Sequence, residues 1–380
     1  MGNNVFKERM RFSVLKENLY NGLSVVSSIT SKNLTLPILQ NVKMVAGQGS
    51  VEFSTTNLEI GIRYKVRGKV DEPGEMTVPA RVFLEIVNTL PNERVDCRSE
   101  ENTLHAECAN SKTALRGVAA EEFPVIPTLS DGIEISCEAK ECVDALEQIL
   151  FSVASDESRP EIHGVYANAE KETLTLASTD GFRLSERQVS LVGGVGDRQI
   201  MKIIPSRTLQ ELERLVGHGG ENGAVQWVIG ENQLLLRYGN GEIVSRVIEG
   251  KYPDYRQVIP SAHKTTVTVA TKELLQLVRG AGLFCRSGMN DVRCYFSPEQ
   301  KELRVRAANT QIGEYDAAVS AQVAGEENDI ALNYRFFLDG LAALKSDLVV
   351  LEMTEKNNPI VLKAAEGKRK YLHLIMPIKQ

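Results

Sequence analysis

Apolar and polar residues alternate along this chain in blocks that repeat. In the first block, a short alternating run leads into a Lys-Glu pair at Lys16, Lys140 and Lys272, at intervals of 124 (16 to 140) and 132 (140 to 272). A period of two residues predicts a half-buried strand. After each pair, apolar residues recur at the spacing of one helical face: Leu19, Leu23 and Val26; Val143, Leu146 and Leu150; Leu275 and Val278. The chain therefore contains three predicted strand–helix units.

Two further blocks repeat in the same order. One is an alternating strand that ends in a turn, at residues 51–58, 174–181 and 303–310. The other is a strand that leads directly into an amphipathic helix with an arginine near its start. The last residues of that strand are Pro79, Pro205 and Asn333, at intervals of 126 (79 to 205) and 128 (205 to 333).

A fourth block, an apolar residue followed by proline, closes each unit. It is found at Phe123-Pro124, Tyr252-Pro253 and Met376-Pro377. Four blocks in one order, three times over, predict three tandem copies of one α+β domain. Each copy has two helices packed on antiparallel sheets, with about eight short strands. The predicted domains are residues 1–130, 131–258 and 259–380, with residues 1–9 as an additional N-terminal tail.

Three similar domains in tandem suggest an arc. An arc whose ends match can close into a ring when two copies associate head to tail. The alternative, that the repeats are a coincidence in an unrelated α+β chain, would have to account for all four blocks.

Composition agrees with a soluble globular protein. Hydrophobic residues make up 42% of the chain and charged residues 25%. No apolar run approaches the roughly 18 to 20 residues needed to span a bilayer, and the N-terminus does not resemble a signal peptide. The six cysteines form no CxxC pair, which favours reduced thiols in the cytoplasm. The net charge of −6 neither supports nor excludes nucleic-acid binding, because the distribution of charge matters more than its sum.

The motifs of common enzyme classes are missing. The chain has no P-loop, and the glycines at 193–196 lie between two predicted strands, not before a helix. Asp180-Gly-Phe182 matches one kinase triplet without the other kinase motifs. His105 and Cys108 have the spacing of two zinc ligands, but nothing nearby completes a set. The sequence predicts a non-catalytic protein with no metal and no cofactor.

Several segments resemble the bacterial sliding clamps, the beta subunits of DNA polymerase III. The resemblance covers residues 10–380 and is carried by residues 35–41, 156–160, 178–184, 252–256 and 376–378. It implies a homodimeric ring of six domains that encircles duplex DNA, with helices along the bore and sheets outside. It also implies a clamp-loader ATPase that opens the ring, and polymerases and repair proteins that dock on it through short peptides. Membranes have no part in this function.

A clamp that slides must contact phosphates and avoid base edges. Basic residues on the predicted helices, or matching basic residues of the family, are therefore candidates for sequence-independent DNA contacts. These candidates are Lys32, Arg81, Arg159, Arg207, Arg214, Arg279, Arg335 and Lys345. For each of them the alternative is a solvated charge or a structural partner, and for Arg159 a structural role is a strong rival.

The resemblance also implies a partner-peptide groove between the second and third domains. Its wall comprises Ile162, Thr179, Gly181, Phe182, Arg183, Leu184, Pro253, Val258, Met289, Asn333, Phe336, Pro359, Leu374, Ile375, Met376, Pro377 and Ile378. Flexible methionines suit a groove that accepts several partners. For most of these residues the alternative is core packing.

The dimer interface implied by the resemblance uses Leu115 of the first domain against Leu283 and Phe284 of the third, and for each of them the alternative is a core role. The chain departs from the family at Phe182, where many relatives carry a polar ring. It departs also at Gln257 and at the Lys379-Gln380 ending, and each departure can shift peptide preference.

Two rival functions follow from the same sequence. One is a tandem-domain interaction scaffold that does not encircle DNA. The other is a DNA-modifying enzyme, which would need a metal-binding carboxylate cluster that the sequence does not display.

Overall fold

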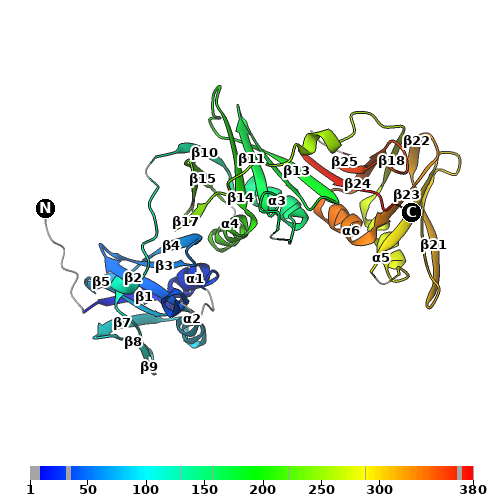
Figure 1. Ribbon diagram of the computed structural model, residues 1–380. Coiled ribbons are helices and arrows are strands. Elements are labelled where there is room, and N and C mark those ends of the chain that lie inside the picture. Colours follow the sequence, from blue (N-terminus) through cyan, green and yellow to red (C-terminus); the bar gives the residue numbers. More distant parts are fainter. Residues whose placement is uncertain are drawn as a thin grey trace. The chain divides into compact units, whose positions relative to one another are not determined.

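The computed structural model describes residues 9–30, 36–129, 131–156, 158–220, 222–286, 288–365 and 370–379. The chain forms two compact units. The first consists of residues 1–140 and 207–247, and the second of residues 141–206 and 248–380. Each unit contains two antiparallel sheets, and many of their strands are labelled in Figure 1.

The first unit contains a five-stranded and an eight-stranded sheet. The order of the five-stranded sheet is β5 (Lys69–Glu72), β1 (Arg11–Leu15), β7 (Arg94–Glu100), β8 (Thr103–Cys108) and β9 (Ser111–Arg116). The order of the eight-stranded sheet is β10 (Ile133–Glu138), β15 (Ala224–Ile229), β16 (Gln233–Tyr238), β17 (Gly241–Arg246), β4 (Ile60–Arg67), β3 (Ser50–Thr56), β2 (Asn41–Gly47) and β6 (Gly74–Pro79).

The second unit contains a nine-stranded and a four-stranded sheet. The order of the nine-stranded sheet is β14 (Gln199–Pro205), β11 (Gly164–Glu170), β12 (Thr173–Thr179), β13 (Arg183–Ser190), β26 (Tyr371–Ile375), β25 (Ile360–Ala364), β24 (Leu348–Met353), β18 (Thr265–Ala270) and β22 (Gln322–Gly325). The order of the four-stranded sheet is β21 (Gly313–Ser320), β20 (Glu302–Asn309), β19 (Asp291–Ser297) and β23 (Asn328–Asn333).

Six α-helices lie in the described part of the chain, two in each predicted copy. They are α1 (Lys16–Ser27), α2 (Ala80–Thr89), α3 (Ala139–Ile149), α4 (Ser206–Gly219), α5 (Thr271–Gly282) and α6 (Tyr334–Ala343). Short 3-10 turns lie at Pro37–Gln40, Ala120–Glu122, Leu150–Ser152 and Tyr255–Val258.

The predicted helix starts are confirmed. Each Lys-Glu pair lies in the first turn of α1, α3 or α5, and α2, α4 and α6 begin directly after Pro79, Pro205 and Asn333. At α6 the chemical reason is visible, because the side chain of Asn333 accepts a hydrogen bond from the backbone N–H of Arg335 and caps the helix. The helices thus begin where local sequence favours them.

Sheets continue from one copy of the repeat into the next. Strand β17 of the middle copy pairs antiparallel with β4 of the first, with Ile243 opposite Ile62. In the same way β26 of the third copy pairs with β13 of the middle one, with His373 opposite Ser185. The middle copy therefore contributes strands to both compact units.

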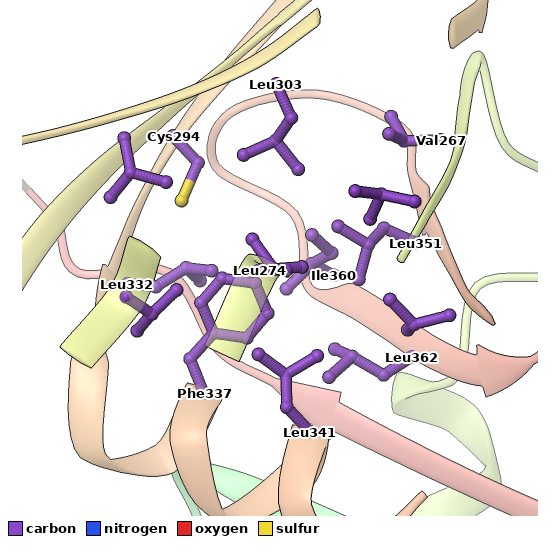
Figure 2. Close-up of a cluster of buried hydrophobic side chains, with 14 of the residues drawn as sticks. Val267, Leu274, Cys294, Leu303, Leu332, Phe337, Leu341, Leu351, Ile360 and Leu362 are labelled. Carbon is purple, nitrogen blue, oxygen red and sulfur yellow. The ribbon is translucent and has the colours of Figure 1, made fainter. Parts of the chain in front are cut away.

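Each unit has its own apolar core. Phe12, Phe53, Phe83 and Trp227 are fully buried in the first unit. In the second unit, Figure 2 shows Phe337 and Leu341 of α6 projecting into a cluster that also contains Leu274. Complete burial of one such side chain stabilises the fold by roughly 1.5–3 kcal/mol. The helices are thus anchored to the sheets, and the turns between elements are held in place.

Candidate groove and basic residues

The second unit carries a small, mostly apolar groove beside the β13–β26 pair. Its volume is about 200 Å³. The residues that line it are Arg159, Ile162, Thr179, Gly181, Arg183, Leu184, Pro253, Asp254, Tyr255, Val258, Leu374 and Met376. Residues far apart in sequence therefore meet here, as expected for a binding site at the edge where two repeats join.

A tight turn between β12 and β13 forms one lip of the groove. The Thr179 hydroxyl donates to the carbonyl of Arg183 at 2.7 Å and accepts from the N–H of Gly181 at 3.0 Å. The Asp180 carboxylate accepts from the N–H groups of Phe182 and Arg183, both at 2.9 Å. Gly181 has φ +89°, a left-handed conformation that glycine adopts without steric cost. The turn is therefore specified by local polar residues.

Arg183 is held rigidly at the base of this turn. Its guanidinium donates to Asp180 at 3.0 Å, to Asp339 of α6 at 2.6 Å and to the carbonyl of Phe151 at 2.6 Å. The guanidinium also lies 4.4 Å from the ring centroid of Phe336. The two carboxylates compensate the charge of Arg183, and the hydrogen bonds hold its side chain in one position on the groove wall.

The rest of the lining comes from the end of β26 and from the segment that contains Pro253 and Tyr255. Met376 is 36% exposed, and its backbone N–H donates to the carbonyl of Phe182 at 2.8 Å. Tyr255 donates its hydroxyl to Glu186 at 2.6 Å. Burial, with the nearby Glu186 charge, raises the Tyr255 pKa far above its usual value. The tyrosine stays a neutral donor and fixes the segment that bears Pro253.

The structure brings together nine of the seventeen residues predicted for the groove. Eight lie off its wall. Phe182 and Met289 are 65% and 52% exposed, and Ile375 is fully buried in the sheet. The other five are Asn333, Phe336, Pro359, Pro377 and Ile378.

Three further residues line the groove. Asp254 and Tyr255 lie within residues 252–256, one of the segments that resemble the sliding clamps. That segment could have indicated them, although neither residue was predicted to line the groove. Arg159 was predicted to contact DNA. It lies 3.7 Å from Glu161, and no spacing in the sequence indicated that it would face the groove.

Two of the basic candidates share one buried carboxylate in the first unit. Glu211 of α4 is 2% exposed, and its oxygens lie 2.8 Å from the Arg207 guanidinium and 3.6 Å from that of Arg214. It also accepts the Ser28 hydroxyl at 2.5 Å, and Arg207 donates to the Ser28 carbonyl at 3.1 Å. Both arginine side chains remain 51% exposed, so each can still reach an external phosphate.

The remaining basic candidates differ in how strongly they are held. Lys345 lies 2.6 Å from Asp144 and 2.5 Å from Glu147, both on α3. Arg81, Arg279 and Arg335 are exposed. Arg81 contacts the hydroxyl of Thr30 at 3.4 Å and Arg335 that of Tyr334 at 3.4 Å. Lys32 lies outside the described residues.

The residues predicted for self-association lie at sheet edges or beside one. Leu115 is in β9, the last strand of its sheet. Leu283 follows α5 and is 74% exposed, and Phe284 stacks on Tyr315 of edge strand β21 with ring centroids 5.9 Å apart. Each of the three is thus close to a strand that could accept another chain.

Three family models match the chain consecutively. They describe the N-terminal, central and C-terminal domains of the DNA polymerase III beta subunit, and match residues 10–127, 136–254 and 256–379. The chain belongs to the DNA polymerase III beta subunit family. This membership confirms the predicted three-domain clamp fold and the predicted function, a non-catalytic sliding clamp for a replicative DNA polymerase.

Individual members of the family are similar over nearly their whole length. The beta sliding clamp of Bacillus subtilis is 29% identical, over 97% of this chain and 100% of the relative. That of Synechococcus elongatus is 28% identical, over 97% and 99%. The crystal structure of the Bacillus subtilis DNA polymerase sliding clamp superposes with a TM-score of 0.92 at 28% identity, covering 98% of this chain and 100% of the other.

The described residues of this beta-subunit chain lack two further features. No group of three or more His, Cys, Asp or Glu side chains is arranged to hold a metal ion there. Within the same residues, no helix is both long and apolar enough to cross a membrane.

Proposed function

We propose that two copies of this chain close head to tail into a ring around duplex DNA, through antiparallel pairing of β9 with β21. The observation that carries this proposal is the repeated junction within the chain. Strand β17 pairs with β4, and β26 with β13. By position in their copies, β9 corresponds to β17 and β26, and β21 corresponds to β4 and β13. In the described part of the chain, β9 and β21 are edge strands.

The internal junctions also supply a register for the ring interface. Val244 of β17 lies opposite Gly61, and Ser245 lies opposite Ile60. Counting each strand from its preceding turn puts Ala114 opposite Glu314 of the other copy and Leu115 opposite its Gly313. Leu283 and Phe284 then cover the apolar side of this interface beside Tyr315.

The register can be tested with paired cysteines. Directly opposed residues in an antiparallel pair have Cα atoms about 4.5–5.5 Å apart, within reach of a disulfide. An Ala114→Cys/Glu314→Cys variant should oxidise to a covalent ring that runs as a dimer on a denaturing gel. The control, Ala114→Cys/Asp316→Cys, is two residues out of register and should cross-link much less. Equal yields from both variants would refute this register.

We propose that the basic candidates contact DNA phosphates without reading sequence. Exposed guanidinium groups suit this role because phosphate contacts carry no sequence information. Arg81, Arg279 and Arg335 are the strongest of the eight. Arg207 and Arg214 keep half of their surface exposed while bound to Glu211. Lys345, tied to two carboxylates, and Arg159, at the groove, contribute least.

We propose that the groove beside β13 and β26 takes short peptides from the polymerase, the clamp-loader ATPase and repair proteins. All seventeen predicted residues remain candidates, with the nine on the wall as its centre. The apolar lining and the half-exposed Met376 suit several apolar peptide side chains. The proposed location is the cytoplasm, and the proposed domain limits remain 1–130, 131–258 and 259–380.

The decisive experiment for encirclement compares two DNA topologies. The protein is loaded by a clamp loader onto nicked circular plasmid, the complex is isolated, and half of it is linearised. Retention on the circle with loss from the linear form is expected for a ring. Equal retention on both forms, or no retention with an active loader, would favour the interaction scaffold that does not encircle DNA.

A further inference from the structure

A second hollow lies in the first unit, beside the β4–β17 pair. Its volume is about 370 Å³, and its lining includes Thr56, Leu58, Gly61, Val125, Val244 and Arg246. This position corresponds, one repeat earlier, to that of the groove in the second unit. Nothing in the resemblance or in the family assignment gives this hollow a role.

The lip of the second hollow is built like the lip of the groove. The Thr56 hydroxyl donates to the carbonyl of Ile60 at 2.9 Å and accepts from the N–H of Leu58 at 3.0 Å. The Asn57 side chain accepts from the N–H groups of Glu59 and Ile60, at 3.0 and 2.7 Å. These are the bonds that Thr179 and Asp180 make in the groove, so the two turns are equivalent.

The floors of the two sites correspond residue by residue. Val244 of β17 lies opposite Gly61 of β4, as Leu374 of β26 lies opposite Leu184 of β13. Arg246 is the last residue of β17 and lies two residues after Val244. In the same way, Met376 lies two residues after Leu374, directly beyond the end of β26. All of these residues line one site or the other. The second hollow is therefore the same construction built from different side chains.

Two apolar side chains stand exposed at the rim of the hollow. Leu58 is 51% exposed and Val125 is 91% exposed. Leu58 also has φ +78°, at the position that Gly181 occupies in the groove. A leucine is strained in this left-handed conformation. An exposed, strained leucine is unfavourable for the isolated fold, which points to a contact with another molecule.

A charged residue occupies a place in the hollow that is apolar in the groove. Arg246 replaces Met376, and its side chain is exposed. No Asp or Glu of the described ranges lies within ion-pair distance of its guanidinium. Glu59, also on the lining, accepts a hydrogen bond at its backbone carbonyl from the N–H of Arg246 at 3.4 Å and forms no ion pair with the Arg246 side chain within the described residues. A guanidinium beside apolar side chains is complementary to a carboxylate next to an apolar residue.

We propose that this hollow is a second peptide-docking site, which takes an extended segment with an aliphatic side chain followed by an acidic residue. The aliphatic side chain packs between Leu58 and Val125, and the carboxylate pairs with Arg246. This inference rests on the proposed function, because it assumes that the groove binds peptides and that the hollow, which is built in the same way, does so too. It assigns the carboxylate contact of the first junction to Arg246, whose counterpart in the groove is the uncharged Met376.

Photo-crosslinking of the full-length protein tests the proposal. The probe is a pool of N-acetylated hexapeptides with the diazirine analogue of leucine at the third position, aspartate at the fifth and mixed residues elsewhere. Mass spectrometry of the digested protein then reports which segments carry the label. Label is expected on the segments that contain Leu58 or Val125, in addition to the groove. An asparagine pool in place of the aspartate pool should lower the label at the hollow several-fold.

Two variants and a matched control make the test specific. Leu58→Gly removes the side chain and the strain together, so thermal unfolding should occur at the same or a higher temperature. Label at the hollow should nevertheless fall about tenfold, as expected when a buried aliphatic contact is lost. Arg246→Glu should remove the preference for aspartate over asparagine. The control, Val192→Gly, changes a valine that is 67% exposed and lines neither site, and should alter nothing.

The outcomes separate the two proposals. Label in the groove alone would overturn the second site and leave the proposed function standing. Label at the hollow alone would support the second site and contradict the peptide role of the groove. Label in neither place would refute both.

Discussion

Glu211 connects the first and middle copies of the repeat, and its loss is a sharp test of how that junction is held. Its carboxylate is 2% exposed, accepts the Ser28 hydroxyl at 2.5 Å and lies 2.8 Å from the Arg207 guanidinium. Glu211→Ala removes these bonds. We expect the variant to fold and to be less stable than the native chain.

The magnitude follows from the burial of the partners. Breaking a fully buried ion pair costs about 3–5 kcal/mol, because the remaining charge is left without solvent. Here Arg207 and Arg214 are each 51% exposed and can be hydrated when Glu211 is gone. An exposed pair contributes only about 0–1 kcal/mol. Adding one lost hydrogen bond to a charged group, about 1.5–3 kcal/mol, we expect a total loss of roughly 1.5–4 kcal/mol.

Urea unfolding followed by tryptophan fluorescence measures this loss. Trp227 is the only tryptophan of the chain and is fully buried in β15, in the same unit as Glu211. The control, Glu85→Ala, changes an exposed glutamate within α2 and should shift stability by no more than about 0.5 kcal/mol. If Glu211→Ala shifts it by less than about 1 kcal/mol, or no more than the control, the carboxylate does not hold this junction.

Three further predictions concern other parts of the chain. Arg335→Ala should reduce the salt dependence of DNA binding by a slope of about one and leave stability unchanged, measured by anisotropy across a salt series; an unchanged slope would exclude a phosphate contact. Burial, reinforced by the charge of Arg183, lowers the pKa of His373 to about 3, well below the usual range for histidine. Below about pH 6.5, His373 therefore binds a proton in the unfolded chain and stays neutral in the folded one, so the free energy of unfolding should fall as the pH drops. In a pH series of thermal unfolding, His373→Asn should flatten this decline, and an equal decline in both proteins would contradict the assignment. Burial raises the pKa of the Cys285 thiol to about 11, so its reaction with a thiol reagent at pH 8 should be slow and should accelerate about tenfold per pH unit. Cys285→Ser should remove that phase, and a fast phase that survives the substitution would show that another thiol is responsible.

Local sequence determined much of what the structure contains. Alternation with a period of two and helical spacing identified strands and helices, and Pro79, Pro205 and Asn333 marked the starts of three helices. The Thr179–Asp180–Gly181 turn was visible as a strand ending in a tight connection, because its hydrogen bonds join residues four apart or fewer. Threefold repetition of these local signals predicted three copies of one domain.

Only the tertiary structure decided which strands meet across the copies. Strand β17 pairs with β4 through backbone N–H and C=O groups, which every edge strand offers. The side chains of β17 therefore do not indicate that β4 is its partner. The pairing creates both hollows, gives Arg159 a place on the groove wall and separates Ile375 from it. Burial of Glu211 depends on α1 and α4 lying together, 183 residues apart at Ser28 and Glu211. Contacts over such separations arise from the packing of whole elements, and a local pattern does not carry them.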